Sequence, residues 1–384
     1  MRYYKHYTRK ISIFIAFMLI ISQVCFANNS KGDDTIKIIA ENKAKKFMML
    51  STGKDVSIKE SIAFTDFNNQ ITAYYIAFNS GNEDNGYMIL SLLKKENPLV
   101  DFSFSGPGIL EKIKSFAQKK GLLVSMETIK YLGPDLLFIE DSVNDVLYDP
   151  STGIVYDRLE IVELYEQSYG GSNVVIADGI INWDSSAIPE NTIHYIPYLY
   201  SNVNYAYGYW LMDDFSEGQV CAPTCATNIM WYWGIKRARS WTIEQPYNYT
   251  GYMLAEYIFG CMYSAMGTVY GLGTADAMVK VGYKHWLNGR GGTLGSTYTV
   301  NDLTNNSFSS FTSAINGGLP IHVMLRNTGA LSQGHDVMGV GYAVSLSGDD
   351  YLAVFDGWYM AIRFVDFDYY PLIKGMSVWV STSL

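Results

Sequence analysis

A cysteine at the start of a predicted helix is the residue of this 384-residue chain best placed to do chemistry. Cys221 precedes a segment whose apolar residues share one helical face, and Pro223 fits only the first turn of such a helix. We therefore predict a helix over about 222–233, with Cys221 at or beside its N-cap. The free N–H groups and the positive end of a helix favour thiolate over thiol. The pattern thus predicts an activated, nucleophilic sulfur.

A histidine and an aspartate far along the chain are its candidate partners. His335 begins a strand pattern over 335–342, and Asp356 ends the next one over 351–356. A turn near 345–350 would make these strands neighbours and bring His335 and Asp356 to the same end. An imidazole can take the proton of a thiol, and a carboxylate on its other nitrogen can fix its orientation. We predict Cys221 as nucleophile, His335 as base and Asp356 as the group that orients His335.

These motifs resemble a known family. Cys-Ala-Pro-Thr-Cys-Ala-Thr-Asn-Ile-Met-Trp-Tyr-Trp-Gly, at 221–234, resembles the nucleophile helix of papain-like cysteine peptidases of the bacteriocin-processing and streptopain type. Gly334-His335 with Val340-Gly341-Tyr342, and Asp356-Gly357-Trp358, resemble the histidine strand and the Asn/Asp–Trp element of that clan, and Gly-Gly-Leu-Pro-Ile at 317–321 resembles its lead into the sheet. The resemblance covers about 185–384. It implies an α+β, papain-like fold, with a helical subdomain and an antiparallel sheet, and peptide hydrolysis through a thioester acyl-enzyme.

The position of a glutamine leaves the nucleophile open. These families place a Gln about five or six residues before the nucleophile, where its amide helps to bind the oxyanion. Gln219 is two residues before Cys221 but six before Cys225, and Phe215 stands six before Cys221. Glutamine spacing thus favours Cys225, whereas the free N–H groups of a helix start favour Cys221. We retain Cys221 and assign Gln219 to the oxyanion, with Cys225 as the alternative.

The amino terminus and the charge bear on location and partners. Four basic residues precede an apolar run over 11–26, which predicts a signal peptide over 1–27 and a secreted protein, either free or held at the cell surface. No later run approaches the length of a membrane span. The formal charge is −9, and loss of the four basic residues of the signal leaves −13. An acidic chain without basic runs is a poor partner for nucleic acid.

The mature chain divides into two predicted domains. A helix over 33–49, three β-rich segments within 61–92, a helix over 110–120 and three short strands within 136–156 predict a smaller α+β domain. This domain is similar to the pro-domain of streptopain-like zymogens. We predict a pro-domain over 28–168 that inhibits the enzyme intramolecularly, a Gly/Ser-containing linker over 169–184 cut within about 166–190, and the peptidase domain over 185–384.

Other readings stay open beside this one. Neither a paired Cys-x-x-Cys motif nor a phosphate-binding loop is present in the sequence, so we expect neither a metal nor a cofactor. His194, His322 and His285 are expected to be structural. The expected partner is a peptide or protein substrate. The alternatives are an inactive homologue that binds peptide or glycan through its many aromatic residues, and a transpeptidase that uses the same thioester.

Overall fold

The computed structural model describes residues 34–381, with gaps at 82, 95, 107, 126–127, 134, 170–176, 200–208, 217, 246, 289–296 and 328–333. The predicted signal peptide and the Gly/Ser centre of the predicted linker lie outside the described residues. Among the described residues, none of the helices is long and apolar enough to cross a membrane.

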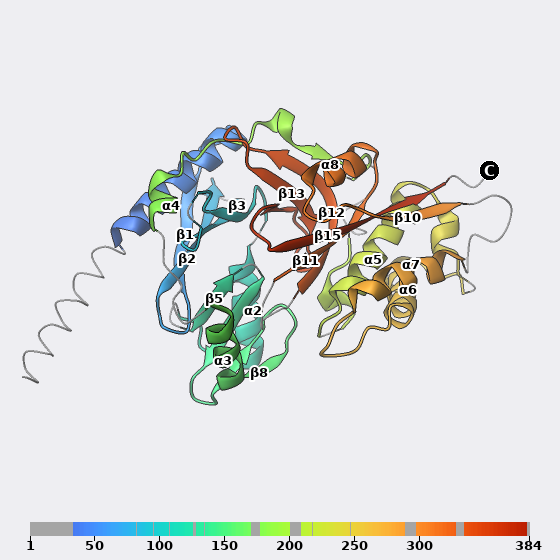
Figure 1. Cartoon of the computed structure of the whole chain (residues 1–384), viewed down its shortest axis with the longest axis horizontal. Helices are drawn as coiled ribbons and strands as arrows, with labels where there is room; N and C mark the ends of the chain where they lie inside the picture. Colours follow the sequence, from blue (N-terminus) through green and yellow to red (C-terminus); the bar gives the residue numbers. More distant parts are fainter. Residues whose placement is uncertain are drawn as a thin grey trace, which may run out of the picture.

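The amino-terminal region contains both helices and strands (Figure 1). It begins with a helix over 34–52, which packs Ala40, Ala44 and Phe47 into the core. Its first four strands form an antiparallel meander, and its fifth strand pairs parallel with the first. The helix over 109–120 ends at Gly121, whose left-handed φ of 70° glycine tolerates well. The elements are β1 (Ser57–Thr65), β2 (Ile71–Ser80), β3 (Glu83–Ser91), β4 (Leu99–Ser103), α2 (Ile109–Lys120), β5 (Ile129–Gly133), β6 (Leu136–Asp141), β7 (Val146–Tyr148), β8 (Val155–Asp157) and α3 (Arg158–Tyr169).

A short helix, α4 (Ala177–Asn182), lies inside the range predicted as linker. Ile180 and Trp183 are buried, and Trp183 packs against Phe47 of the first helix with ring centroids 5.8 Å apart. Lys43 of that helix donates to the carbonyl of Ile181 at 2.6 Å. The segment after the gap at 170–176 therefore packs against the amino-terminal region. The prediction of a linker over 169–184 rested on its Gly and Ser residues and did not consider the apolar residues near 180.

The carboxy-terminal region places helices on one side and a sheet on the other (Figure 1). Its elements are β9 (His194–Tyr195), α5 (Cys221–Trp231), α6 (Gly251–Ala265), α7 (Asp276–Asn288), β10 (Tyr298–Asp302), α8 (Phe308–Asn316), β11 (Ile321–Arg326), β12 (Gly334–Val344), β13 (Asp350–Phe355), β14 (Arg363–Asp366) and β15 (Leu372–Val380). The helix at Cys221 and the two strands expected over 335–342 and 351–356 are confirmed. The mixed α/β architecture with a large sheet is therefore as predicted, although its extent is not.

Both regions share one sheet, which the sequence patterns do not indicate. The strand order is β10-β15-β11-β12-β13-β14-β4-β3-β2-β1-β5-β6-β7-β8, with β9 paired to β12. The two halves join where β14 pairs antiparallel with β4, with Phe364 opposite Phe102 and Val365 opposite Asp101. We call this junction, with the side chains around it, the seam. Because hydrogen bonds run across it without a break, the two regions form one β-structure.

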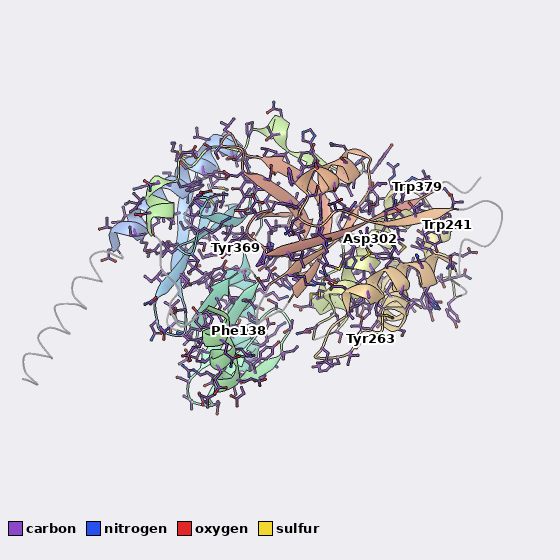
Figure 2. All side chains as sticks on the ribbon, viewed as in Figure 1. Phe138, Trp241, Tyr263, Asp302, Tyr369 and Trp379 are labelled. Carbon is purple, nitrogen blue, oxygen red and sulfur yellow. The ribbon has the colours of Figure 1, made fainter. Side chains whose placement is uncertain are left out.

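The seam is apolar and aromatic at its centre. Phe102 stacks on Phe364 with ring centroids 4.9 Å apart, and it meets Tyr351 edge-on at 5.2 Å. Phe104 packs on the same Phe364 ring. Tyr369, labelled in Figure 2, lies where the regions meet, and its hydroxyl is 3.1 Å from that of Tyr131. Burial of such rings contributes strongly to stability, so this is core rather than a loose contact between domains.

Helix α5 ends at Trp231, close to the end predicted at about 233. After Trp231 the chain continues as one π-helical turn, Tyr232–Lys236, which contains Gly234. A Cβ at Gly234 would lie 2.5 Å from the side chain of Ile243, so glycine is needed here for close packing rather than to cap the helix. The apolar face of α5 continues into this turn, which anchors the helix and so fixes Cys221 at its other end.

Candidate active site

Cys221 is the first residue of α5, as predicted. It is partly buried, and its Sγ accepts hydrogen bonds from the backbone N–H groups of Ala222 and Asp336. Ala222 belongs to the first turn of the helix, and Asp336 follows His335 on β12. The thiol is therefore held between the helix start and the histidine strand.

A small cavity is lined by Cys221 together with two other predicted site residues, His335 and Gln219, but not by Asp356. The cavity measures about 30 Å³, and Gln219, Cys221, His335 and Trp358 are part of its lining. The amino-terminal region also contributes to the lining, through Asp135, Asp149, Ser151 and Thr152. Such a volume admits a water molecule but no peptide. In this structure the site is assembled and closed, and the amino-terminal region forms part of its wall.

The imidazole of His335 is buried and fixed on two sides. Its Nε2 lies 2.7 Å from the backbone carbonyl oxygen of Asp356, and its ring stacks on Trp358 with centroids 4.2 Å apart. A carbonyl oxygen only accepts hydrogen bonds, so Nε2 must carry the hydrogen. The neutral ring then has its lone pair on Nδ1. That nitrogen is the one available to take a proton.

The carboxylate of Asp356 does not make the hydrogen bond to His335 that the sequence predicts. Its Oδ1 accepts the N–H groups of Trp358 at 2.8 Å and Tyr359 at 3.2 Å, and its Oδ2 lies 3.7 Å from Nε of Arg363. These bonds close the tight turn in which Gly357 has a left-handed φ of 77°. The strand that carries His335 and the strand that leads to Asp356 are neighbours, as predicted. The turn, however, directs the carboxylate toward the backbone N–H groups that follow it. Asp356 meets His335 through its carbonyl.

Cys221 and His335 are both uncharged in the closed site. Burial, with the nearby negative charge of Asp336, raises the pKa of Cys221 to about 12, despite the two N–H groups that favour its thiolate. Burial also lowers the pKa of His335 below its ordinary value. The sequence predicts a thiolate at the helix start, and the closed structure corrects this, since desolvation outweighs the field of the helix. An ion pair would require water or substrate in the cavity.

Cys225 lies a turn deeper in α5. It is 3% exposed and belongs to the core cluster, and it is not among the residues that line the cavity. Burial raises the pKa of its thiol well above the ordinary value. Gln219 does line the cavity, next to Gly273, where a Cβ would come within 3.0 Å of its Oε1. The geometry thus places Gln219 beside Cys221 despite its spacing.

A buried polar network beneath the site is one that sequence reasoning missed. Asp336 is paired with Arg326 Nη2 at 2.5 Å and His322 Nε2 at 3.1 Å, and Tyr283 bonds the other nitrogen of His322 at 3.0 Å. Although burial acts against it, these partners lower the pKa of Asp336 to about 2. Alternating polar residues at 322, 326 and 336 on neighbouring strands were the available signal. His322 is structural, as predicted, and the network fixes the backbone that carries His335.

A turn of the amino-terminal region reaches the site. We call residues 149–153 the DPSTG loop. The Asp149 carboxylate accepts the N–H groups of Ser151 and Thr152 and the hydroxyl of Thr152, which folds the turn. The carbonyl of Thr152 in turn accepts the N–H of Gly218 at 2.7 Å. The loop therefore binds the backbone directly before Gln219 and reaches into the cavity around Cys221.

The other histidines that the structure describes lie away from the cavity. His194 stacks on Tyr342 with ring centroids 4.7 Å apart, and His285 is exposed near the end of α7. Across the part of the chain that the structure describes, no group of three or more His, Cys, Asp or Glu side chains is arranged to hold a metal ion.

Comparison with known proteins bears on this site. Residues 194–371 match the model of the Peptidase_C39 like family, a span that contains Cys221, His335 and Asp356. None of the curated proteins matches the chain. Among solved structures, a mutant fragment of prointerpain A from Prevotella intermedia aligns at 9% identity with a TM-score of 0.35, over 83% of this chain and 98% of that one. The family match confirms the predicted resemblance to papain-like cysteine peptidases and supports a cysteine peptidase.

Proposed function

We propose that the chain is a secreted cysteine peptidase made in a latent form, in which Cys221 and His335 perform the chemistry. The observation that carries the proposal is the pairing of a helix-start cysteine with a histidine of fixed tautomer in one cavity. Because Nε2 of His335 donates to the carbonyl of Asp356, Nδ1 is the nitrogen available to act as base.

The reaction follows from these positions. Nδ1 takes the proton of the Cys221 thiol as the sulfur attacks a peptide carbonyl, and the N–H groups at the start of α5 face the negative charge that develops on oxygen. The amide of Gln219 is the proposed second donor. The imidazolium then protonates the leaving amine, which departs, and water hydrolyses the thioester to regenerate the thiol. Asp356 orients His335 throughout, through its carbonyl and through the turn that carries Trp358.

Latency is assigned to the DPSTG loop. The loop lines the cavity and accepts the N–H of Gly218, so a substrate must displace it before reaching Cys221. Because the loop is tethered, even a weak contact acts at an effective concentration in the millimolar range. Cleavage within 166–190 would break the chain between the two regions at a point that is not part of the seam. The shared sheet favours an amino-terminal region that stays bound after such a cut, with the loop as the moving part.

Active-site labelling tests the assignment of the nucleophile. The full chain, Cys221→Ser and Cys225→Ser are treated with an iodoacetamide reagent, and peptide turnover is measured in parallel. We expect loss of both labelling at the site and turnover in Cys221→Ser only. Cys225→Ser is the matched control, because it makes the same chemical change one helical turn away. Loss of labelling and turnover in Cys225→Ser, with retention of both in Cys221→Ser, would overturn the assignment.

The alternatives make different predictions. A binding module would retain peptide affinity in Cys221→Ala and show no turnover in any form of the chain. A transpeptidase would transfer the acyl group to an added amine in preference to water, so product analysis with and without a peptide amine distinguishes it from a hydrolase.

A further inference from the structure

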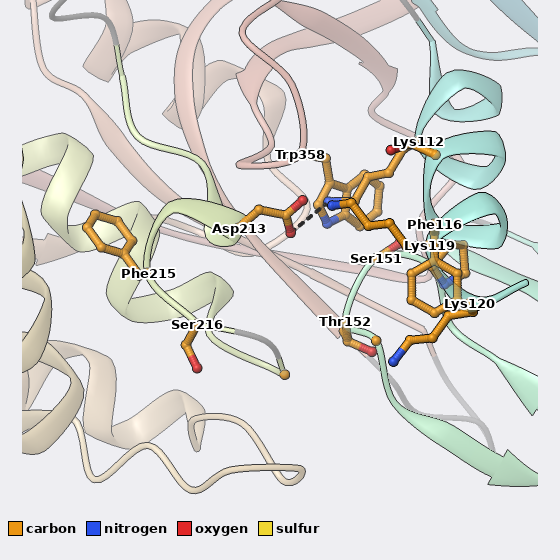
Figure 3. A pocket seen from close by; sticks show the side chains of 14 residues that line it. Lys112, Phe116, Lys119, Lys120, Ser151, Thr152, Asp213, Phe215, Ser216 and Trp358 are labelled. Carbon is orange, nitrogen blue, oxygen red and sulfur yellow. Dashed lines mark ion pairs between the residues drawn. The ribbon is translucent and has the colours of Figure 1, made fainter.

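A second and larger hollow lies beside the closed cavity. We call it the α2 groove. It measures about 570 Å³ and is lined on one side by Lys112, Phe116, Lys119 and Lys120 of α2 and on the other by Asp213 and Phe215. Figure 3 shows the lysines of α2 on one wall, with Asp213 and Phe215 on the other. One wall therefore belongs to the amino-terminal region and the other to the peptidase region.

The α2 groove and the closed cavity share part of their lining. Ser151 and Thr152 of the DPSTG loop and Trp358 line both. Trp358 also stacks on His335. Displacement of Ser151 and Thr152 would therefore open the cavity into the groove. A peptide bound across Cys221 would then extend along the Trp358 side into the groove.

The charge of the described lining is basic. Lys112 is only 10% exposed, and its Nζ lies 3.5 Å from Asp213 Oδ1, drawn as the dashed line in Figure 3. That pairing leaves Lys119 and Lys120, both exposed, as the charges facing the groove. Lys120 lies 5.7 Å from the ring centroid of Phe116, which keeps its ammonium group near the aromatic wall. In a chain of net charge −9, this wall is locally positive.

The wall would persist in the active enzyme. Helix α2 belongs to the same unit as β4, which the seam joins to β14 through aromatic packing and a shared sheet. Arg363, 4% exposed, is paired across the seam with Asp135 at 3.0 Å and Asp101 at 3.4 Å. Release of the region would break these two ion pairs and expose both the stacked rings and the edge of β14, and this exposure costs free energy.

We propose that the α2 groove binds acidic side chains of the peptide substrate on the Trp358 side of the scissile bond, with Lys119 and Lys120 as the residues that select them. This rests on the proposed function. The aromatic walls contact the apolar stems of such residues, and the two ammonium groups contact their carboxylates. Exposed pairs of this kind contribute modestly, on the order of a few-fold in affinity each, and weaken as salt increases.

Binding can be tested without turnover because the groove is open in the closed form. The full chain with Cys221→Ala is titrated with two fluorescein-labelled peptides, Ala-Glu-Glu-Ala-Glu-Ala and its Gln counterpart, and anisotropy is followed. The variant Lys119→Gln/Lys120→Gln is compared with Lys54→Gln/Lys284→Gln, which removes the same charge from exposed lysines outside the groove. We expect the parent and the control to prefer the Glu peptide by roughly 3- to 20-fold at low salt, and the groove variant to lose that preference.

Two outcomes overturn the proposal: equal binding of the Glu and Gln peptides by the parent, or an unchanged preference in the groove variant. Turnover of both peptides by the chain with Cys221 intact is measured separately. Turnover of the two peptides at equal rates would leave the peptidase assignment standing and defeat the acidic subsite. A preference for the Glu peptide in binding, without any turnover, would support the acidic subsite and defeat the peptidase assignment.

Discussion

Two contacts join the amino-terminal region to the rest of the molecule, and they are built differently. The seam consists of strand pairing, stacked rings and a buried guanidinium that faces three carboxylates. The DPSTG loop is a polar turn whose bonds are largely internal, with its Thr152 carbonyl bound to Gly218. The first kind of contact resists separation and the second yields to water. We therefore infer that the amino-terminal region stays attached at the seam while the loop moves to open the site.

The largest effect is expected when the seam loses its buried cation. Arg363→Met leaves Asp101, Asp135 and Asp356 without the guanidinium between them, so we expect a loss of about 3–5 kcal/mol in the free energy of unfolding. Urea denaturation measures it. The control is Lys280→Met, which removes the exposed partner of Asp302 and should cost at most about 1 kcal/mol. Equal losses in both variants would show that the seam is no stronger than a surface pair.

A change in the DPSTG loop is expected to have a smaller effect on stability but a measurable effect on the reactivity of Cys221. Asp149→Ala removes the carboxylate that folds the turn, so the loop should leave the cavity and iodoacetamide should alkylate Cys221 at least ~10-fold faster, equivalent to about 1.4 kcal/mol. Asp141→Ala is the matched control, because Asp141 closes a similar turn at Val143 and Asn144 away from the cavity. An unchanged rate of Cys221 alkylation in Asp149→Ala would show that this loop does not cause the latency.

A further effect expected at the seam is a dependence of stability on pH. One guanidinium cannot satisfy three carboxylates equally, and burial raises the pKa of Asp101 to about 7, against an ordinary value of 3.8. A raised carboxyl pKa means that the folded state holds its proton longer, so this group's contribution to stability declines as pH rises from about 4 to 7. Asp101→Asn should flatten that decline, which denaturation at pH 5 and pH 7 measures. The same slope in wild type and variant would contradict the assignment.

The local elements were predictable because their signals are local. Pro223 and the apolar face behind it mark the start of α5, and the strand patterns at 335–342 and 351–356 indicate β12 and β13. The seam was not predictable, since β4 is five residues long and its partner β14 lies more than 250 residues away. Strand alternation describes which face is buried, but it does not name the partner strand.

The site shows the same limit at the scale of single side chains. The strand order placed His335 beside Asp356, but whether the carboxylate or the carbonyl meets the imidazole depends on the turn at Gly357. The ionisation of Cys221 was misjudged for a related reason. A helix start is visible in the sequence, whereas burial by a loop some 70 residues earlier is not.

Peptide turnover in the loop-opened chain tests the central claim, that Cys221 and His335 form a catalytic pair closed off by the DPSTG loop. The full chain, Asp149→Ala, and Asp149→Ala combined in turn with Cys221→Ser, Cys225→Ser or His335→Ala would be compared on one peptide library. We predict that Asp149→Ala turns over peptides faster than the full chain, that Cys221→Ser and His335→Ala abolish this activity, and that Cys225→Ser retains it. Turnover that survives His335→Ala, or that is lost in Cys225→Ser alone, would contradict the account.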